Sequence, residues 1–491
     1  MKPVKVEEIV KATGGTLLCG SNTIVIQNVI IDSREEAEHS LFVPIVGEKT
    51  DGHRYVSGAI EHGAKALFMS KTTEYKEMIL SLAREKEIAV IEVEHTVDAL
   101  QKFASWYRSG FSIPVIGITG SVGKTTTKEM IASALETEKN VLKTIGNKNS
   151  QIGLPLMMFY LEDAHEVAVI EMGMSEVGEM KNLAFVAKPE CAVITNIGVA
   201  HIAQLGSQEA IRKEKLAIAN QFLDGSVLFM NGNDALLSET VTQITQNKIT
   251  IDCNEETKEA LKKAKTITYG IGEGFTYSAK QIVTTEKGVN FTVCYEEGGE
   301  YIEFPISLKV YGEHNILNAL SALAVAKYIG IDEKIAAKGL EQYEPIAMRG
   351  QIKKIDGITW IDDTYNASPD SMKSGANVLL SLAGKRHIIV FADVLELGEA
   401  SEDLHKEVGA YVAKLKKQDK SVDVLLTVGE QARFLAEEAK KQGLLHVVSF
   451  SSNLEASNYL KELLQEEDVV LVKGSRGMKT EEILKACLEN K

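Results

Sequence analysis

One short segment constrains the fold more than any other. The apolar run VIGIT, at 115–119, leads directly into a glycine-rich loop and the residues GKTTT. A buried strand that ends in such a loop and continues as a helix is typical of phosphate-binding sites, because backbone N–H groups and the helix N-terminus hold anions. Lys124 can reach the β- and γ-phosphates, and the Thr125 hydroxyl can ligate Mg²⁺. The spacing departs from the usual pattern, since Ile118 stands where the first glycine is expected.

The alternation of strands and helices continues on both sides of this loop. Helices are expected at 96–108 and from 207 to about 222, and hairpins are expected to turn at Gly288 and at Gly298-Gly299. In the third unit we expect four strands, in ITWIDD, HIIVFAD, DVLLTVG and DVVLVKG, with helices beginning near 368, 401, 430 and 480. At about 150 residues per domain, a chain of 491 residues predicts about three domains. We place them at 1–111, 112–345 and 346–491. The expected fold class is α/β: a small α/β N-terminal domain, a central mostly parallel sheet of the P-loop ATPase kind with antiparallel hairpins added, and a C-terminal Rossmann-like domain.

Charge and cysteine content exclude some classes of protein. The chain has 54 lysine and arginine residues and 69 aspartate and glutamate residues, so its net charge is −15. This charge disfavours a general nucleic-acid binder, but it does not exclude an anionic substrate held by a local cluster of groups. The five cysteines contain no C-x-x-C pair, which favours reduced thiols in a cytoplasmic protein. No apolar run approaches the ~18 residues of a membrane helix, so we expect no membrane insertion.

Polar residues follow the next two strands after the phosphate loop. Glu171 follows VAVI, and His201 lies after AVITNI. Both belong to the carboxyl edge of the predicted sheet, where ligands bind in open α/β folds. Either residue alone is more often structural, but together beside a phosphate loop they favour a metal site. Lys215 sits on a helix with several lysines, and its spacing alone is typical of a solvated face.

The third unit contains the unusual segment DDTYNASPDSM, at 362–372, before a well-capped helix. Asp363 could accept hydrogen bonds from a ribose or bind a metal, and Tyr365 could stack on a base. As an ordinary turn, the segment would only satisfy its own backbone. Arg349 could reach a γ-phosphate from another domain, like an arginine finger, or be a solvated residue between domains.

Together these segments resemble the Mur ligase family of peptidoglycan synthesis along essentially the whole chain. The motifs are IDSR, DGH, TGSVGKTTT, GNKNSQIGLP, EMG, TNIGVAH, GEHNILNAL, MRGQ, DDTYNASPDSM, VLELGE and LVKGSRGM. The last three point to the members that add D-alanyl-D-alanine. The resemblance implies a monomeric ligase that uses ATP and two Mg²⁺ ions. It would join D-alanyl-D-alanine to UDP-N-acetylmuramoyl-tripeptide through an acyl phosphate.

The resemblance also implies roles for individual residues. ATP would be bound by Thr119, Gly120, Ser121, Val122, Gly123, Lys124, Thr125, Thr126, Asn315, Asn318, Arg349 and Asp363. The UDP-sugar peptide and dipeptide would be bound by Ser33, Arg34, Asp51, Gly52, His53, Asn147, Asn149, Tyr365 and Asn366. Metal would be held by Thr125, Glu171, His201 and Lys215, and catalysis would rest on Lys124, His201, Lys215 and Arg349.

The resemblance reverses the interpretation of Lys215, because relatives carry this lysine as a carbamate. Carboxylation turns a cation into an anion that can ligate a second Mg²⁺, and a lysine beside cations is more easily deprotonated. One departure from the family is Ala392, which stands where glycine is usual and would narrow the dipeptide site if a ligand approaches the backbone there.

Three alternatives stand beside this interpretation. A Mur ligase could instead add lysine or diaminopimelate to the UDP-muramoyl dipeptide. A folyl-polyglutamate type ligase would lack a domain before the phosphate loop. A P-loop kinase or NTPase switch would explain TGSVGKT but neither the first domain nor DDTYNASPDSM.

Overall fold

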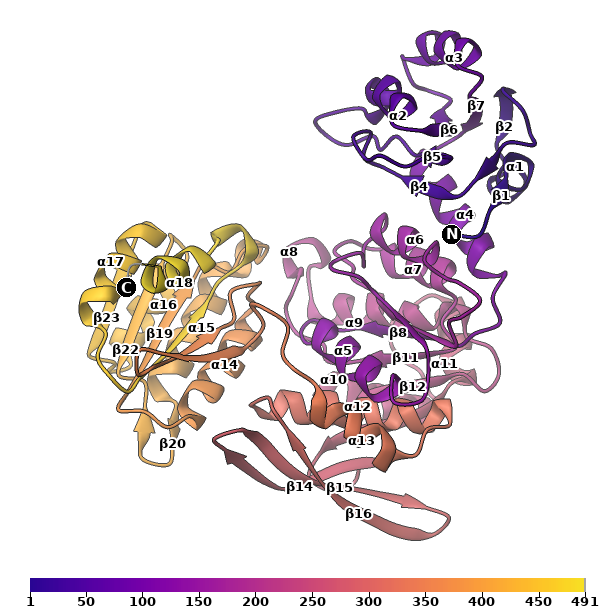
Figure 1. The fold of residues 1–491 in the computed structure, drawn as a ribbon. Coiled ribbons are helices and arrows are strands. Elements are labelled where there is room, and N and C mark those ends of the chain that lie inside the picture. The colour runs from indigo at the N-terminus through magenta and orange to yellow at the C-terminus, as the bar shows by residue number, and fades with distance from the viewer. Residues whose placement is uncertain (490–491) are drawn as a thin grey trace.

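The computed structural model describes residues 1–489 and contains three large sheets that follow one another along the chain. Figure 1 shows the N-terminal domain standing on the central domain through α4, with the C-terminal domain on the other side of the central domain. This arrangement confirms the expected α/β fold class.

The N-terminal domain has one sheet in the order β2-β7-β6-β5-β4 and a separate antiparallel pair, β1-β3. Only β2 runs antiparallel within the larger sheet. Its elements are β1 (Val4–Lys5), α1 (Val6–Thr13), β2 (Thr16–Cys19), β3 (Val25–Ile26), β4 (Asn28–Ile30), β5 (Ser40–Phe42), α2 (Val56–Glu61), β6 (Ala64–Ser70), α3 (Lys76–Glu85), β7 (Ala89–Val93) and α4 (Thr96–Arg108).

The central sheet runs β16-β15-β14-β13-β12-β11-β8-β10-β9, parallel from β9 to β14 and antiparallel from β14 to β16. Its strands are β8 (Val115–Thr119), β9 (Val141–Lys143), β10 (Val167–Glu171), β11 (Cys191–Ile194), β12 (Val227–Asn231), β13 (Lys265–Ile271), β14 (Tyr277–Thr285), β15 (Gly288–Glu297) and β16 (Glu300–Leu308). Its helices are α5 (Lys124–Leu135), α6 (Gly153–Met158), α7 (Glu179–Ala187), α8 (Ile202–Leu205), α9 (Gln208–Leu216), α10 (Ala235–Thr245), α11 (Glu255–Lys263), α12 (Glu313–Ile329) and α13 (Glu333–Gln342).

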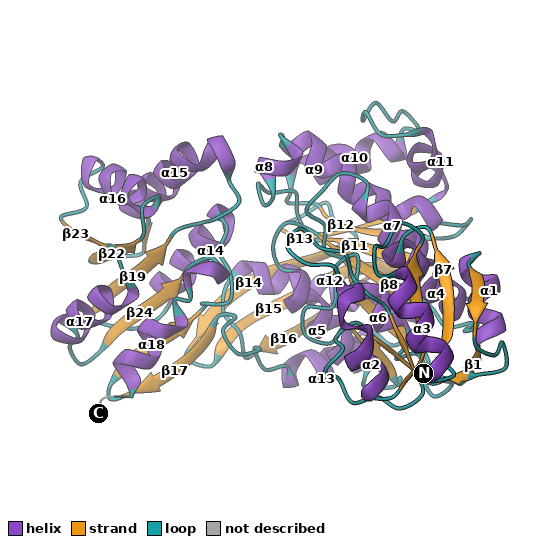
Figure 2. Ribbon diagram, turned by 90° about the horizontal axis from the view of Figure 1, so that it is seen from above, coloured by secondary structure: helices purple, strands orange, loops and turns teal. Residues whose placement is uncertain are grey.

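The C-terminal sheet runs β17-β18-β24-β19-β22-β23, with only β17 antiparallel. Its strands are β17 (Gln351–Ile355), β18 (Ile358–Asp362), β19 (Arg386–Ala392), β22 (Val424–Val428), β23 (His446–Phe450) and β24 (Asp468–Lys473), beside a short hairpin of β20 (Lys416–Lys417) and β21 (Lys420–Ser421). Its helices are α14 (Pro369–Ser381), α15 (Ser401–Lys414), α16 (Ala432–Lys441), α17 (Asn453–Leu463) and α18 (Glu481–Leu488). Figure 2 shows α15 and α16 on one face of this sheet and α17 and α18 on the other.

The two ends of the central domain are joined to their neighbours in different ways. One apolar core runs without interruption from the N-terminal domain through α4 into α6 and α7. Phe103 and Tyr107 of α4 pack against Phe159 with ring centroids 4.9 and 5.4 Å apart. The C-terminal domain has its own cores on the two faces of its sheet. None of the helices within residues 1–489 is long and apolar enough to cross a membrane.

Candidate active site

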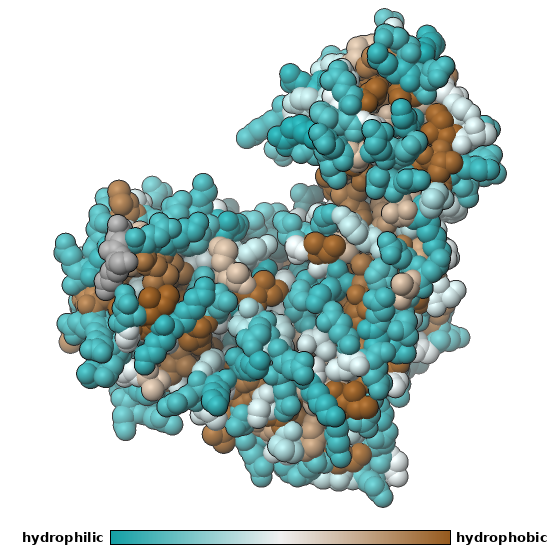
Figure 3. All heavy atoms as spheres, viewed as in Figure 1, coloured by the Kyte–Doolittle hydropathy of each residue, from teal (hydrophilic) through white to brown (hydrophobic). Residues whose placement is uncertain are grey.

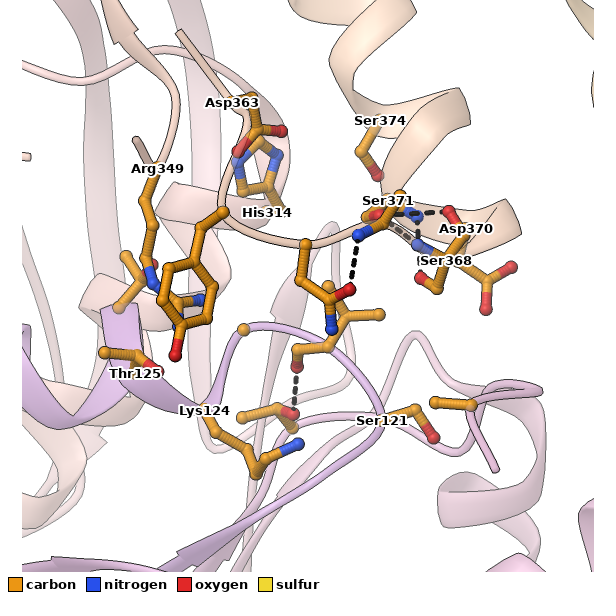
Figure 4. Close-up of a pocket in the computed structure, with 18 of the residues that line it drawn as sticks. Ser121, Lys124, Thr125, His314, Arg349, Asp363, Ser368, Asp370, Ser371 and Ser374 are labelled. Carbon is orange, nitrogen blue, oxygen red and sulfur yellow. Dashed lines mark hydrogen bonds between the residues drawn. The ribbon is translucent and has the colours of Figure 1, made fainter. Parts of the chain in front are cut away.

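A cleft of about 700 Å³ lies between the central and C-terminal domains. The central domain lines it with the phosphate loop, the ends of β10 and β11 and the start of α12. The C-terminal domain lines it with segments 363–375, 394–397 and 473–477. Figure 4 shows Ser121, Lys124 and Thr125 on one side of this cleft, facing Asp363, Ser368 and Asp370 on the other. In Figure 3 the molecule is deeply hollowed between its N-terminal and C-terminal domains.

The phosphate loop forms at the carboxyl end of β8, as the sequence predicts. Gly120 has φ 150°, and a Cβ there would lie 1.8 Å from Oγ1 of Thr195, so only glycine fits. Helix α5 begins at Lys124 without a side-chain cap, which leaves the N–H groups of its first turn free for an anion. The N–H groups of Ser121 and Val122, by contrast, donate to Oδ1 of Asn196 at 3.1 and 2.9 Å.

Lys124 lies at the centre of the charged groups in the cleft. Its Nζ donates to the carbonyl of Gly120 at 2.7 Å. Burial lowers the pKa of Lys124, the nearby carboxylate of Glu171 raises it, and the guanidinium of Arg349 lowers it further. A negative charge on Glu171 and a positive charge on Arg349 therefore both act on the Lys124 side chain, within the loop that would surround a phosphate.

Glu171 is held in place by two residues of the preceding loop. Asn149 donates from Nδ2 to Oε1 of Glu171 at 2.7 Å, and the Glu171 N–H donates to Oγ1 of Thr144 at 2.9 Å. Its other oxygen, Oε2, is buried and has no hydrogen-bond partner among the described residues. An unpartnered carboxylate oxygen beside a phosphate loop fits a cation ligand. Asn149 lines the cleft but already uses its amide to position Glu171, and Asn147 lines the cleft beside it.

His201 and Lys215 lie on the other side of Lys124. His201 has φ 64° and its Nδ1 stands 3.0 Å from Oε2 of Glu396 in the C-terminal domain. Lys215 is 2% exposed, and no group within residues 1–489 accepts a hydrogen bond from its Nζ. Burial, together with the charge of Lys124, holds the pKa of Lys215 well below its usual value. A neutral, unpartnered amine is the form that could react with CO₂.

The metal site expected from the sequence is not preformed by protein groups alone. Among the described residues, no group of three or more histidine, cysteine, aspartate or glutamate side chains could hold a metal ion. Glu171 and His201 line the cleft, whereas Lys215 is buried behind it. The donor set fits Mg²⁺ when oxygens from Thr125 and from a modified lysine are added to that of Glu171.

The C-terminal domain contributes its own polar groups. The guanidinium of Arg349 lies 3.9 Å from the ring centre of Tyr365. Asp363 accepts a hydrogen bond from Nζ of Lys473 at 2.6 Å, and Lys473 also donates to the carbonyl of Asn366 at 2.9 Å. All five residues line the cleft, so the segment at 362–372 is more than a self-satisfied turn.

Two asparagines of α12 lie at the floor of the cleft. Thr127 of α5 donates to Oδ1 of Asn318 at 2.9 Å, and Asn318 donates to Asn315 at 3.2 Å. Asn315 also donates to the carbonyl of Tyr311 at 2.8 Å. These bonds tie α12 to the helix that begins at the phosphate loop.

The predicted residues of the N-terminal domain lie outside this cleft. Arg34 is exposed and pairs with Asp32 at 2.7 Å, next to Ser33. His53 is fully buried, accepts from the N–H of Ser70 at 3.0 Å and donates to Asp51 at 2.6 Å. The residues around Gly52 border a second cavity of about 330 Å³, lined by Val46, Asp51, His53, Ser70, Thr72, Thr73 and Glu74.

Three further residues do not line the cleft. Thr119 is fully buried, and Gly120 faces Thr195. Ala392 belongs to a core of the C-terminal domain, where a Cβ on Gly474 would lie 2.8 Å from the methyl group of Ala392. A narrowing of the dipeptide site by Ala392 therefore has no basis in this geometry.

Sequence reasoning missed several residues of the cleft. Asn196, Asp370, Glu396, Lys473 and His314 all line it. Each of them lies within a motif named in the sequence analysis, but the roles were assigned to other residues of that motif. Only the fold shows that their side chains face the same space.

Comparisons with known proteins agree with this geometry. Three family descriptions match the chain: "Mur ligase family, catalytic domain" at 25–108, "Mur ligase middle domain" at 118–326 and "Mur ligase, glutamate ligase domain" at 348–476. A UDP-N-acetylmuramoyl-tripeptide–D-alanyl-D-alanine ligase of Bacillus subtilis is 37% identical over 95% of this chain and 94% of its own.

Solved structures of similar proteins agree with these family matches. MurF from Acinetobacter baumannii has a TM-score of 0.85 and 28% identity, with both chains covered completely. MurF ligase from Thermotoga maritima, solved in complex with ADP, has a TM-score of 0.77 and 26% identity over 94% of this chain and 97% of its own. The chain therefore belongs to the Mur ligase family, in the group of the UDP-N-acetylmuramoyl-tripeptide–D-alanyl-D-alanine ligases.

Proposed function

We propose that this chain is an ATP-dependent amide ligase that adds D-alanyl-D-alanine to UDP-N-acetylmuramoyl-tripeptide, giving the pentapeptide precursor of peptidoglycan, ADP and phosphate. The observation that carries the proposal is the 37% identity to a ligase of this name over nearly the whole of both chains. The two-sided cleft supports it, because a three-substrate reaction needs groups from more than one domain around the reacting atoms.

The reaction proceeds in two steps. The free carboxylate of the tripeptide attacks the γ-phosphoryl group of ATP, which forms an acyl phosphate and releases ADP. The amine of D-alanyl-D-alanine then attacks the acyl carbon, and phosphate leaves. The carboxylate and the triphosphate repel each other, so cationic groups must bring them together.

Lys124 and the free N–H groups at the start of α5 supply much of that positive charge. We assign them to the β- and γ-phosphates, and we assign Arg349 to the phosphates from the side of the C-terminal domain. We assign Asn315, Asn318, Asp363 and Tyr365 to adenine and ribose, and Asn147 and Asn366 to the peptide substrates. All six residues line the cleft.

Mg²⁺ would be held by Thr125, Glu171, His201 and a carbamate on Lys215. When bound, Mg²⁺ neutralises the phosphates and polarises the transferred group. The carbamate would form when the deprotonated form of the Lys215 amine, which the lowered pKa favours, attacks CO₂. A new N–C bond then replaces one C=O π bond of CO₂, and the nitrogen loses one proton. The N-terminal domain would bind the UDP-sugar through Ser33, Arg34 and the residues around the second cavity.

Phosphate release tests the assignment directly. We expect release from ATP only when UDP-muramoyl tripeptide and D-alanyl-D-alanine are both present, with one pentapeptide formed per phosphate. If D-alanyl-D-alanine is inert and the UDP-muramoyl dipeptide with lysine or diaminopimelate releases phosphate, the ligase chemistry stands and the substrate assignment is wrong.

Lys124→Ala tests the phosphate loop. We expect turnover to fall by at least about a thousandfold with the fold intact, because the residue acts on charge that develops in the transition state. Circular dichroism checks the fold, and Lys139→Ala, at an outward-facing position in the same domain, is the matched control. Near-normal turnover of Lys124→Ala would remove this residue from the site.

Lys215→Ala tests the carbamate. We expect most activity to be lost and partly restored by small added carboxylates, which can replace the missing anion. Lys213→Ala, on the same helix with a 46% exposed side chain, is the matched control. An unaffected Lys215→Ala enzyme would return this lysine to a structural role.

A further inference from the structure

Residues 195–199, which we call the linking segment, connect the phosphate loop with the C-terminal domain. The segment leaves β11 and reaches His201 two residues after its end. Thr195 donates from Oγ1 to the carbonyl of Val122 at 2.6 Å, and the Gly198 N–H donates to Oγ of Ser121 at 2.9 Å. The first and fourth residues of the segment are therefore bonded to the phosphate loop.

Asn196 makes the most bonds within this contact. Its Oδ1 accepts from the N–H groups of Ser121 and Val122, at 3.1 and 2.9 Å. Its Nδ2 donates to the carbonyl of Val122 at 3.0 Å, and its own carbonyl accepts from the Ser121 N–H at 3.1 Å. A side-chain amide supplies the acceptor and the donor on two separate atoms, as this geometry uses them.

Asp370 reaches the other side of the same segment from the first turn of α14. Its carboxylate lies beside the backbone N–H of Val199, which lowers the pKa of Asp370 against the stronger raising by burial. A Cβ added to Gly198 would lie 2.3 Å from Oδ2 of Asp370 and 3.2 Å from Cβ of Ser121. Gly198 is therefore enclosed between the phosphate loop and the C-terminal domain, and both touch one backbone position.

A third contact keeps the linking segment from shifting on its own. The Ile197 N–H donates to Oδ2 of Asp234 at 2.8 Å, and Asp234 also caps α10. Asn231 donates to the carbonyl of Thr195 at 3.0 Å. With its middle anchored to β12 and α10, the segment can transmit the position of one neighbour to the other.

We propose that Asn196 and Asp370 are positioning residues that act through the linking segment: Asn196 shapes the phosphate loop, and Asp370 docks the C-terminal domain on the segment that the loop holds. The inference rests on the proposed function for the identity of the nucleotide and of the peptide substrate used in its tests. Neither residue needs to touch a reacting atom. Asn196 takes two N–H groups of the loop out of phosphate binding and thereby directs the anion to the start of α5. Asp370 places the groups of α14 and its preceding loop over that anion.

Asn196 is tested with Asn196→Ala and Asn196→Asp. Asparagine to aspartate keeps the acceptor, removes the donor to Val122 and adds a charge beside the phosphates. We expect binding of the non-hydrolysable analogue AMP-PNP with Mg²⁺, measured by calorimetry, to weaken at least about fivefold in the first variant and more in the second. Asn182→Ala, on the exposed side of α7, is the matched control. Unchanged binding in both variants would overturn the role of Asn196.

Asp370 is tested with Asp370→Ala. We expect AMP-PNP binding to stay within about twofold of wild type, because the phosphate loop keeps its own contacts. We expect the radius of gyration of the wild-type chain to decrease with AMP-PNP and UDP-muramoyl tripeptide, and this decrease to be absent in Asp370→Ala. We also expect kcat of the variant to fall at least about tenfold with little change in KM for ATP. Asp403→Ala, in the first turn of α15, is the matched control. Equal compaction with normal kcat, or weakened AMP-PNP binding, would overturn the role of Asp370.

The two proposals can fail separately. A wild-type chain that releases no phosphate with any Mur substrate refutes the proposed function, whereas AMP-PNP binding and scattering still test the linking segment. The double variant tests whether the two residues act in separate steps: its loss in AMP-PNP affinity should equal that of Asn196→Ala alone, because Asp370 acts after the nucleotide is bound. Thermal unfolding of every variant confirms that the chain is folded.

Discussion

The junction between the N-terminal and central domains is one continuous apolar core, whereas the junction between the central and C-terminal domains combines polar contacts with a small apolar one. In the first, one continuous core passes through α4, and buried aromatic rings of both domains meet. In the second, Ile202 and Tyr311 of the central domain pack against a core of the C-terminal domain. The polar contacts there are His201 Nδ1 with Glu396 at 3.0 Å and the Asp370 carboxylate beside the backbone of residues 198 and 199, next to a cleft of about 700 Å³. Apolar burial is strong and close-packed, so it fixes geometry, while a few solvated polar contacts can break and re-form.

This difference assigns different tasks to the two junctions. We expect the N-terminal domain to hold the UDP-sugar at a fixed distance from the phosphate loop. We expect the C-terminal domain to be the more mobile one, because it shares no continuous core with the central domain. The groups that we assign to the reaction line the cleft at this junction, where closure would exclude water from the acyl phosphate.

The largest effect is expected from Phe103→Ala at the apolar junction. Phe103 is fully buried and packs on Phe159, so its loss should reduce the free energy of unfolding by about 3–5 kcal/mol. Urea denaturation measures the loss, and Lys102→Ala, at an exposed position of α4, should stay within about 0.5 kcal/mol of wild type. A loss for Phe103→Ala as small as that of the control would mean that the two domains are not stabilised by a shared core.

A smaller, pH-dependent effect is expected from Asp370→Asn at the polar junction. Burial raises the pKa of Asp370 above its usual value of 3.8; Lys373 opposes this, while Glu407 and Asp234 add to it. The folded chain therefore binds more protons than the unfolded chain above pH 3.8, and this contribution to stability is lost as the pH rises through the raised pKa.

Asparagine has no charge to bury and keeps an acceptor for Val199. Asp370→Asn should therefore be slightly more stable than wild type at neutral pH, and the difference should shrink as the pH falls toward 3.8. Urea denaturation across a buffer series follows the difference. A difference independent of pH would show that Asp370 does not titrate abnormally at this junction.

The smallest effect on stability is expected from Glu396→Gln. Glu396 has a side chain 60% exposed, and exposed ion pairs contribute less than about 1 kcal/mol, so unfolding should hardly change. The charge of Glu396 raises the pKa of His201 against the stronger lowering by burial, so its removal should lower that pKa further. NMR titration of the His201 ring measures the shift. A loss of stability as large as that of Phe103→Ala would contradict the distinction between the junctions.

Much of the fold was predictable because its signals are local. Thr96–Arg108 forms the helix that its sequence predicts, and the glycine turns near 287 and 298 produce the expected hairpins. The expected helix from 207 to 222 instead changes to a tight 3-10 turn after Leu216. Strands β17 and β23 and helix α17 were missed. The two strands lie at the edges of the C-terminal sheet and are less buried than its central strands, so their apolar pattern is weaker.

The residues of the site also fall into two groups, those that the sequence could place and those that it could not. Lys124, Glu171 and His201 could be placed near one another from the sequence, because the carboxyl ends of neighbouring parallel strands meet at one edge of a sheet. The burial of Lys215 could not be predicted from the sequence. Its spacing indicated a solvated helix face, whereas packing buries it close to the charge of Lys124. The role of Asn149 also depends on packing, because its contact with Glu171 joins a loop to the end of β10, 22 residues further along the chain.

The sequence by itself determined the fold class, the phosphate loop and the family, because each follows from short-range patterns of apolar residues, glycines and motifs. Only the tertiary structure decided which junction is fixed, which residues enclose the cleft and how Asn196 and Asp370 meet the linking segment. These depend on side chains that are distant in the chain and share one space, and on the solvent that packing removes from them.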